Sequence, residues 1–241
     1  MLQKGPAEFS NNEYECIILA GGFGTRLKSA VPDLPKCMAP INGKPFLQYL
    51  IDYLIQQGVH SFIFSLGYLH EFIESFLQEN YPTLIYKIVV ENEPLGTGGA
   101  IKLAIEQAHQ KNVIILNGDT MFTVNIQELY NFHTQHDCIT TLSLKPMQQF
   151  ERYGVVSINE QCHIQQFQEK KYYESGLING GVYALNVDLF KKLSLPKVFS
   201  FEKDYLEKYF ASYKMMGLIQ DKYFIDIGIP EDFEKAKKEL S

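Results

Sequence analysis

Short apolar runs alternate with amphipathic segments through the first 140 residues. The run from Tyr14 to Ala20 is largely apolar and ends in glycines, which is typical of a strand buried on both faces. Leu69, Ile73 and Phe76 repeat at the spacing of one helix face. This alternation predicts a mainly parallel sheet with helices on both sides. The other strands predicted here are Ser61 to Leu66, Leu84 to Val90 and Val113 to Leu116, and the other helices are Pro45 to Gln57, Gly99 to Ala108 and Asn125 to His136.

After Cys138 the pattern changes to strands joined by short turns, which predicts a mixed or antiparallel region. The predicted strands are Cys138 to Leu144, Val155 to Ile158 and Gly181 to Leu185, followed by helices near Phe201 to Phe210 and Pro230 to Leu240. No linker-like composition separates the two regions and no repeat is seen. We therefore expect a flexible tail over residues 1–12 and a single domain over residues 13–241, with halves of about 13–140 and 141–241.

Composition and charge narrow the class of protein. The 241 residues are 46% hydrophobic and 21% charged, as in a soluble globular protein. The 22 basic residues against 28 acidic ones exclude a broadly basic nucleic-acid surface, so an anionic ligand must meet locally placed cations. No apolar run approaches the roughly 18 residues of a membrane span, and the N-terminus lacks the apolar core of a signal peptide. We expect a cytoplasmic protein with no nucleic-acid or membrane partner.

Cysteine and histidine positions do not predict a metal site. The four cysteines, Cys16, Cys37, Cys138 and Cys162, lie too far apart for a zinc knuckle or a redox motif, so free thiols are expected. His133 and His136 form the only near pair of histidines and have no third ligand close by in the sequence.

A glycine-rich turn directly follows the first predicted strand, from Gly21 to Leu27. Glycine lets backbone N–H groups approach a ligand closely, which suits phosphates, although a purely structural turn would have the same composition. Leu27 occupies the third glycine position of a dinucleotide-binding fingerprint, and Pro45 replaces the hydroxyl residue of a Walker loop, so both motifs are disfavoured. Arg26 and Lys36 place two cations near the turn, which indicates a local anion site.

The segments LAGGFGTRL, from Leu19 to Leu27, and LPK, from Leu34 to Lys36, resemble the signature of sugar-1-phosphate nucleotidyltransferases. This resemblance implies a three-layer α/β/α fold with a mainly parallel mixed central sheet, Rossmann-like and of the GT-A-like type. The resemblance continues in family order through Glu93 to Gly99, Asn117 to Asp119, Tyr153 to Val155, Phe167 to Lys170, Asn179 to Gly181 and Asp226 to Gly228.

The resemblance also implies the reaction, in which a sugar 1-phosphate oxygen attacks the α-phosphorus of a nucleoside triphosphate in line and releases pyrophosphate. Such a displacement depends on positioning and charge neutralisation. Asp119 follows an apolar strand at the edge where open α/β sheets bind ligands; an exposed helix cap is the alternative interpretation, and the resemblance favours a metal ligand. With Asp226 it would hold Mg²⁺.

The same resemblance assigns roles by position and places the nucleotide in the first half and the sugar phosphate in the second. The residues with implied catalytic roles are Arg26, Lys36 and Asp119, and those with implied metal contacts are Asp119 and Asp226. The implied nucleotide-binding residues are Leu19, Ala20, Gly21, Gly22, Gly24, Thr25, Glu91, Gly96 and Thr97. The implied sugar-phosphate-binding residues are Gly154, Glu169, Lys170, Asn179 and Gly181.

The segment from Val31 to Leu47 is similar to D-glycero-α-D-manno-heptose 1-phosphate guanylyltransferases, which make GDP-heptose for capsules and other surface polysaccharides. That similarity implies GTP and the heptose phosphate as substrates. Mannose 1-phosphate or another hexose 1-phosphate remains the alternative substrate. An inactive nucleotide-sugar-binding regulatory subunit is the alternative of a different class, and it would be expected to lack reactive residues such as Lys36. Because few residues follow Asp226, we expect no C-terminal β-helix of the kind that some relatives carry. A homodimer remains an alternative to a monomer.

Overall fold

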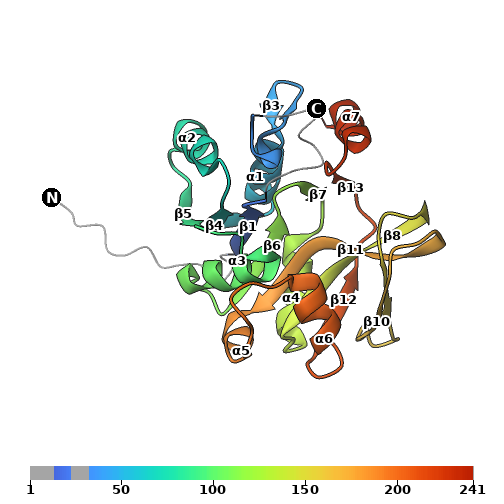
Figure 1. Ribbon diagram of the computed structural model, residues 1–241. Helices are drawn as coiled ribbons and strands as arrows, with labels where there is room; N and C mark the ends of the chain where they lie inside the picture. The colour runs from blue at the N-terminus through green and yellow to red at the C-terminus, as the bar shows by residue number, and fades with distance from the viewer. Residues whose placement is uncertain (1–13, 23–32, 241) are drawn as a thin grey trace.

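The computed structural model describes residues 14–22 and 33–240, and these build a nine-stranded mixed sheet between two layers of helices (Figure 1). Four parallel strands form one part of the sheet, in the order β6-β1-β4-β5. They are β1 (Tyr14–Ala20), β4 (Val59–Leu66), β5 (Ile85–Val90) and β6 (Asn112–Asn117). The strands predicted in the first 140 residues are therefore confirmed to within two residues at each end.

The other part of the sheet is largely antiparallel and begins at the long strand β11, which pairs with β6. Its strands are β8 (Thr140–Phe150), β9 (Val155–Ile158), β10 (Ile164–Gln168), β11 (Tyr173–Asn186) and β12 (Met215–Ile219). Only the β12–β8 pair in this part is parallel. Two small ladders lie outside the sheet, β2 (Pro40–Ile41) with β3 (Lys44–Pro45) and β7 (Thr120–Phe122) with β13 (Phe224–Asp226).

Helices alternate with strands mainly in the first part of the chain, before β8. The α-helices are α1 (Phe46–Gln56), α2 (His70–Asn80), α3 (Gly96–Ala104), α4 (Ile126–Gln135), α5 (Val187–Lys191), α6 (Glu207–Tyr209) and α7 (Pro230–Glu239). The 3₁₀ turns are η1 (Lys36–Met38) and η2 (Ile105–Gln107), and η3 (Phe201–Leu206) is a π-helix.

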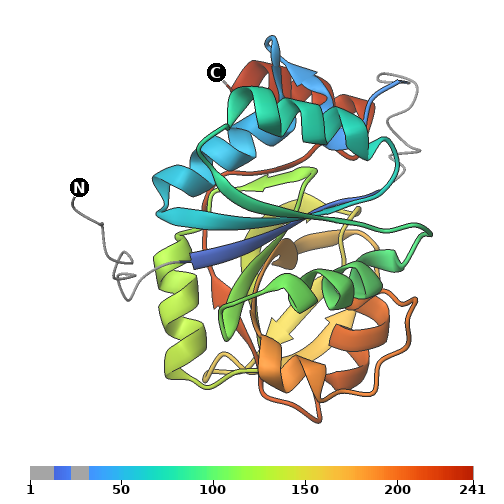
Figure 2. The same ribbon diagram turned by 90° about the vertical axis from the view of Figure 1, so that its left-hand side faces the viewer.

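Alternate residues of the central strands point into two separate cores. Cys16 and Ile18 of β1 belong to the core that contains α1, α2, α4 and α7, whereas Ile17 belongs to the core that contains α3, α5 and η3. Because side chains alternate across a strand, a strand covered on both faces must be apolar at successive positions. Figure 2 shows α1, α2 and α7 on one side of the sheet and α3, α5 and α6 on the other. The three expected layers are confirmed.

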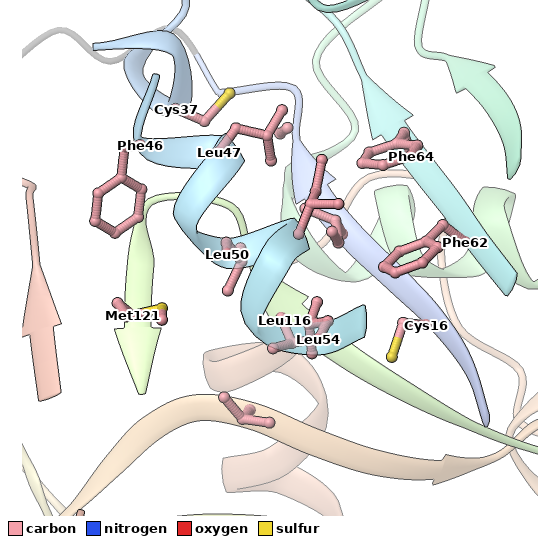
Figure 3. Packing of buried hydrophobic residues seen from close by; sticks show 14 of the residues in the cluster. Cys16, Cys37, Phe46, Leu47, Leu50, Leu54, Phe62, Phe64, Leu116 and Met121 are labelled. Atoms are coloured by element: carbon pink, nitrogen blue, oxygen red, sulfur yellow. The ribbon is translucent and has the colours of Figure 1, made fainter. Parts of the chain in front are cut away.

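Helix α1 shows how a sequence pattern becomes a packed face. Leu47, Leu50 and Leu54 are fully buried against the sheet, where Figure 3 places them opposite Phe62, Phe64 and Leu116. Burial of each such side chain contributes about 1.5–3 kcal/mol. Pro45 precedes the helix with φ −58°, and Gly58 follows it with φ +85°, which agrees with the predicted start and end.

Several local features differ from the sequence predictions. The third helix begins at Gly96 rather than Gly99, and the helix expected over Phe201 to Phe210 is a π-helix followed by the short α6. Strands β8 and β11 are longer than predicted because they pair with each other along most of their length. The unpredicted strands β7 and β13 have only three residues each, too few for a visible periodicity.

Candidate active site

The carboxyl ends of the parallel strands meet at one edge of the sheet, the usual ligand-binding edge of an open α/β fold. Leu19 and Ala20 end β1, and the N–H of Gly118, just after β6, donates to the Leu19 carbonyl at 2.8 Å. A Cβ on Gly118 would lie 2.9 Å from that carbonyl oxygen, so a larger residue would force the segments apart. The segments that lead to Gly21 and to Asp119 are thereby held together.

Glu91 lies at a neighbouring strand end, just after β5, and its carboxylate faces two glycines. A Cβ added to Gly21 would lie 2.7 Å from Glu91 Oε1, and one added to Gly67 would lie 2.9 Å from it. The N–H of Leu95 donates to Glu91 Oε2 at 3.1 Å, while burial raises the pKa of the carboxyl group. The structure therefore packs Glu91, one of the predicted nucleotide-binding residues, against Gly21.

Lys36, Asp119 and Asp226 form an ion-pair cluster from three distant parts of the chain. Lys36 Nζ lies 2.5 Å from Asp119 Oδ2 and 3.5 Å from Asp226 Oδ1. The short ladder between β7 and β13 pairs Asp226 with Thr120, and the N–H of Ile227 donates to the Asp119 carbonyl at 3.1 Å. These backbone bonds place the two carboxylates on either side of one ammonium group.

The electrostatics of this cluster favour a bound cation. Burial and the charge of Asp119 raise the pKa of Asp226, although Lys36 and the N–H of Gly228, which donates to Asp226 Oδ1 at 2.8 Å, oppose the rise. Two close carboxylates are the hard oxygen donors that Mg²⁺ takes from a protein, with substrate phosphates and water completing its coordination. Asp119 and Asp226 therefore fit a divalent cation. In the described residues, no group of three or more His, Cys, Asp or Glu side chains is gathered for a metal.

A cavity of about 430 Å³ opens beside this cluster and extends along the second part of the sheet. Its floor and walls come from the ends of β6 and β13, from β9, β10 and β11, and from the π-helix η3. The polar and charged residues that line it are Lys36, Asn117, Asp119, Thr120, Tyr153, Gln168, Glu169, Lys170, Asn179, Tyr183, Ser200, Glu202, Lys203, Glu207 and Asp226. Its size suits one monosaccharide phosphate and part of a second ligand.

All five residues predicted for the sugar phosphate line this cavity: Gly154, Glu169, Lys170, Asn179 and Gly181. Glu169 and Lys170 directly follow β10 and are exposed at the cavity wall. A Cβ on Gly154 would lie 2.4 Å from the Gln168 carbonyl oxygen, so glycine permits the close approach of β9 to β10. Gly181 has φ +72° and packs against the Asn117 side chain.

The Asn179 side chain is already engaged by the protein. Its Nδ2 donates to the Tyr183 hydroxyl at 2.9 Å, and its Oδ1 accepts from the Gly181 N–H at 3.1 Å. Asn179 keeps one N–H and one lone pair for a ligand. It can therefore both shape the cavity and contact the sugar phosphate.

Gly96 and Thr97 begin α3, and this helix start packs against and hydrogen-bonds to the segment that precedes the π-helix. Gly96 has φ +70°, and a Cβ there would lie 2.6 Å from the Phe199 carbonyl oxygen. The N–H of Gly98 donates to that oxygen at 3.0 Å, and the N–H of Phe199 donates to the Leu95 carbonyl at 3.0 Å. The segment is a packed helix start rather than the loop expected before Gly99.

None of the described residues predicted to bind the nucleotide lines the cavity, although Leu19 and Ala20 lie at the strand end beside it. Leu19, Ala20, Gly21 and Glu91 lie at the neighbouring strand ends described above, and Gly22 is exposed beside them. Gly24, Thr25 and Arg26 fall outside the described residues, as does the predicted tail over residues 1–12.

Sequence reasoning missed a set of cavity residues from the π-helix segment: Ser200, Glu202, Lys203 and Glu207. Such a mixture of polar and charged residues is typical of any exposed helix face, so nothing in the sequence distinguishes these residues from ordinary surface residues. Tyr153 was seen only as part of a motif; burial and the charge of Asp226 raise its pKa to about 12, so it remains a neutral hydroxyl at the cavity wall.

Comparisons with known proteins identify a family and two similar relatives. Residues 15–241 match the family described as nucleotidyl transferase. The chain is 50% identical over 226 residues to the D-glycero-alpha-D-manno-heptose 1-phosphate guanylyltransferase of Aneurinibacillus thermoaerophilus, covering 94% of this chain and 98% of the relative. It is 42% identical over 219 residues to the enzyme of the same name from Campylobacter jejuni, covering 91% and 96%.

A solved structure shows the same fold. HddC from Yersinia pseudotuberculosis complexed with GMP-PN superposes with a TM-score of 0.85 at 38% sequence identity, covering 95% of this chain and all of that one. No helix in residues 14–22 and 33–240 is long and apolar enough to cross a membrane.

Proposed function

Because the chain belongs to the nucleotidyl transferase family, which it matches over residues 15–241, we propose that it transfers a guanylyl group from GTP to D-glycero-α-D-manno-heptose 1-phosphate. A phosphate oxygen of the sugar attacks the α-phosphorus of GTP and forms the new P–O bond. The bond from the α-phosphorus to the oxygen bridging the β-phosphorus breaks, and pyrophosphate leaves. The products are GDP-heptose and pyrophosphate.

One observation carries the chemical part of this proposal: the Lys36 ammonium lies between the Asp119 and Asp226 carboxylates at the wall of a cavity large enough for a sugar phosphate. Reactions between phosphates depend on positioning and on neutralising charge. The attacking oxygen is already anionic, so no general base is required. Lys36 neutralises the charge that develops on the departing pyrophosphate.

Asp119 and Asp226 hold Mg²⁺ in this proposal. When bound, Mg²⁺ polarises the phosphate oxygens and lowers the cost of bringing two polyanions together. The hydrogen bond from the Gly228 N–H fixes the Asp226 carboxylate, and the backbone bond from Ile227 to Asp119 keeps the two side chains at one place. Burial and the nearby charge of Asp119 raise the pKa of Asp226, and a cation held by both carboxylates would lower the cost of keeping them charged.

The two substrates occupy adjoining parts of the strand-end surface. We assign the nucleotide to residues of the half over about 13–140, which are Leu19, Ala20, Gly21, Gly22, Gly24, Thr25, Arg26, Glu91, Gly96 and Thr97. We assign the sugar phosphate to residues of the half over about 141–241, which are Gly154, Glu169, Lys170, Asn179 and Gly181. GTP and sugar phosphates are soluble metabolites, so we place the reaction in the cytoplasm.

The choice of GTP and heptose rests on the similarity to relatives. The two heptose 1-phosphate guanylyltransferases are 50% and 42% identical to this chain, whereas the mannose-1-phosphate guanylyltransferase 1 of Arabidopsis thaliana is 30% identical. HddC, 38% identical, forms a complex with GMP-PN.

The test is pyrophosphate release with Mg²⁺ across a panel that crosses GTP, ATP, CTP, UTP and dTTP with heptose, mannose, glucose and N-acetylglucosamine 1-phosphates. GTP with the heptose should give the highest kcat/KM, exceeding mannose 1-phosphate by about 10–200-fold. Asp119→Asn should abolish turnover, while Asp221→Asn, an exposed carboxylate paired with Lys145, should not. Preference for another pair would correct the substrates, and bound nucleotide without turnover would contradict the enzymatic proposal.

A further inference from the structure

The carboxylate of Glu202 lies in the cavity wall and is surrounded by hydroxyl donors. Thr97 Oγ1 donates to Glu202 Oε2 at 2.8 Å, and Ser200 Oγ donates to the same oxygen at 3.1 Å. The Thr97 hydroxyl is itself fixed, because it accepts from the Phe201 N–H at 2.9 Å. One carboxylate oxygen is thus held firmly within the protein.

The same carboxylate also interacts with a buried tyrosine, Tyr183. The Tyr183 side chain is 1% exposed, and its hydroxyl accepts from Asn179 and hydrogen-bonds Glu202. Burial and the charge of Glu202 raise the pKa of Tyr183 well above its usual value, so the hydroxyl stays protonated. Glu202 is therefore linked through Tyr183 to Asn179, one of the residues assigned to the sugar phosphate.

The π-helix turns further charged residues toward the same cavity. A π-helix closes hydrogen bonds between residues five apart, so such residues stack on one face, whereas in an α-helix they lie apart. Glu202 lies in η3 and Glu207 follows its end, and both line the cavity with Lys203 between them. This face is polar and faces the cavity, although the rest of η3 packs into the core through Phe201 and Tyr205.

The Glu202 face and the ion-pair cluster reach the cavity from opposite sides of the sheet. Asp226 leads directly into α7, which packs in one core, and η3 packs in the other. Figure 2 shows α7 on one side of the sheet and the η3–α6 segment on the other. The cavity therefore has a phosphate end at Lys36 and a second polar end at Glu202.

We infer that Glu202 is a specificity-determining residue that accepts hydrogen bonds from sugar hydroxyls remote from the phosphate. A heptose carries one more hydroxyl-bearing carbon there than a hexose. A carboxylate with one oxygen held by the protein leaves lone pairs on the other for hydroxyl donors. A site built to bond a hydroxyl discriminates against a substrate that lacks it, because its polar group then stays unpaired. This inference rests on the proposed function.

The test compares Glu202→Gln with the wild type on heptose 1-phosphate and mannose 1-phosphate, at saturating GTP and with Mg²⁺. Glutamine keeps the shape but places an N–H₂ group on one side of the carboxamide. We expect kcat/KM for the heptose to fall about 10–100-fold, with a change under about threefold for mannose and under about twofold in the KM for GTP. Glu79→Gln is the matched control. Glu79 is an exposed carboxylate of helix α2 and is not among the residues that line the cavity.

A second variant, Tyr183→Phe, tests the same inference in case Glu202→Gln loses activity through misfolding. Tyr183→Phe keeps the packed ring but removes the hydroxyl that supports Glu202, so the heptose preference should fall by about threefold to tenfold while the KM for GTP stays unchanged. Equal losses for both sugars, or an unchanged heptose preference in Glu202→Gln, would overturn the inference alone. If the wild type turns over no sugar 1-phosphate, the proposed function fails, and this inference fails with it.

Discussion

Both ends of the cavity carry carboxylates, but the groups that surround those carboxylates differ. At the phosphate end, Lys36, Asp119 and Asp226 pair charge with charge, and the side chain of Asp119 is 36% exposed. At the other end, the charge of Glu202 is surrounded by the neutral hydroxyls of Thr97, Ser200 and Tyr183. Ionic partners can exchange for a substrate phosphate or a cation, whereas hydroxyl partners hold a carboxylate in one orientation. These partners suit the proposed roles, with reaction at the Lys36 end and sugar recognition at the Glu202 end.

The largest effect should follow from removing the cation at the phosphate end. Lys36→Gln leaves Asp119 and Asp226 without their shared ammonium and removes the group that we propose neutralises the leaving pyrophosphate. We expect kcat to fall by about 10²–10³-fold, as is typical of losing one donor to a developing charge. The sugar preference should remain, since Glu202 is untouched. Pyrophosphate release with both sugars measures both quantities.

Lys145→Gln is the matched control, because Lys145 also pairs with an aspartate, Asp221, at 2.5 Å but does not line the cavity. Its kcat should stay within about twofold of the wild type. A Lys36→Gln enzyme with normal turnover would remove the distinction between the two ends.

The next largest effect is on the pH dependence of folding stability, which we expect to arise from a buried histidine outside the candidate site. His133 of α4 is 1% exposed, its Nδ1 lies 2.9 Å from Thr141 Oγ1, and its Nε2 has no hydrogen-bond partner within the described part of the chain. Burial lowers the pKa of His133 to about 4, against 6.5 when unfolded. The unfolded chain therefore binds the proton first, and stability falls as the pH drops from about 6.5 to 4, by up to about 3 kcal/mol.

Urea unfolding of His133→Leu between pH 7 and pH 4.5 checks this expectation. The variant should show a flatter dependence of the free energy of unfolding on pH than the wild type. His60→Gln, which replaces an exposed histidine, should keep the wild-type slope. If the free energy of unfolding depends on pH equally in the wild type and in His133→Leu, the acid sensitivity arises from other groups. The ion-pair cluster of Lys36, Asp119 and Asp226 would then be tested next.

The smallest effect tests whether the recognising end depends on tight packing. A Cβ on Gly98 would lie 2.1 Å from the Phe199 ring, so Gly98→Ala must shift α3 or the segment that carries Ser200 and Glu202. We expect a loss of about 1–3 kcal/mol in the free energy of unfolding, measured by urea titration. The heptose preference should fall in the same direction as in Glu202→Gln. Gly22→Ala, whose added Cβ would have no atom of the described residues within 4 Å, should change stability by under about 0.5 kcal/mol.

The parallel part of the fold was predictable because each strand carries its own signal. Tyr14–Ala20 lies between two helical layers, so apolar residues on both faces mark it without reference to its partners. Strand β12 (Met215–Ile219) was missed, because five residues with Gly217 among them give no periodicity, and its position depends on pairing with β8. Where such a strand forms depends on its pairing with a distant segment rather than on its local sequence preference.

The candidate site was predictable only where resemblance supplied the residues. Lys36 and Asp119 were selected by motif, but their contact joins positions 83 residues apart, which no local pattern reveals. Glu202 was missed because its charge fits an ordinary solvated helix, and its direction depends on a π-helix that the sequence does not announce. The roles assigned to Arg26, Gly24 and Thr25 stay predictions, since those residues lie outside the described chain.

The ladder between β7 and β13 has a consequence for the order in which the molecule becomes active during its synthesis. Asp226 reaches Asp119 only through a strand near the end of the chain. The first parallel strands and α1 can pack on a ribosome before that strand has been made, since chains fold from the N-terminus as they emerge. Such a nascent chain has Lys36 and Asp119 but no second carboxylate. In the proposed mechanism, turnover is therefore expected only after β13 has been translated and has paired with β7.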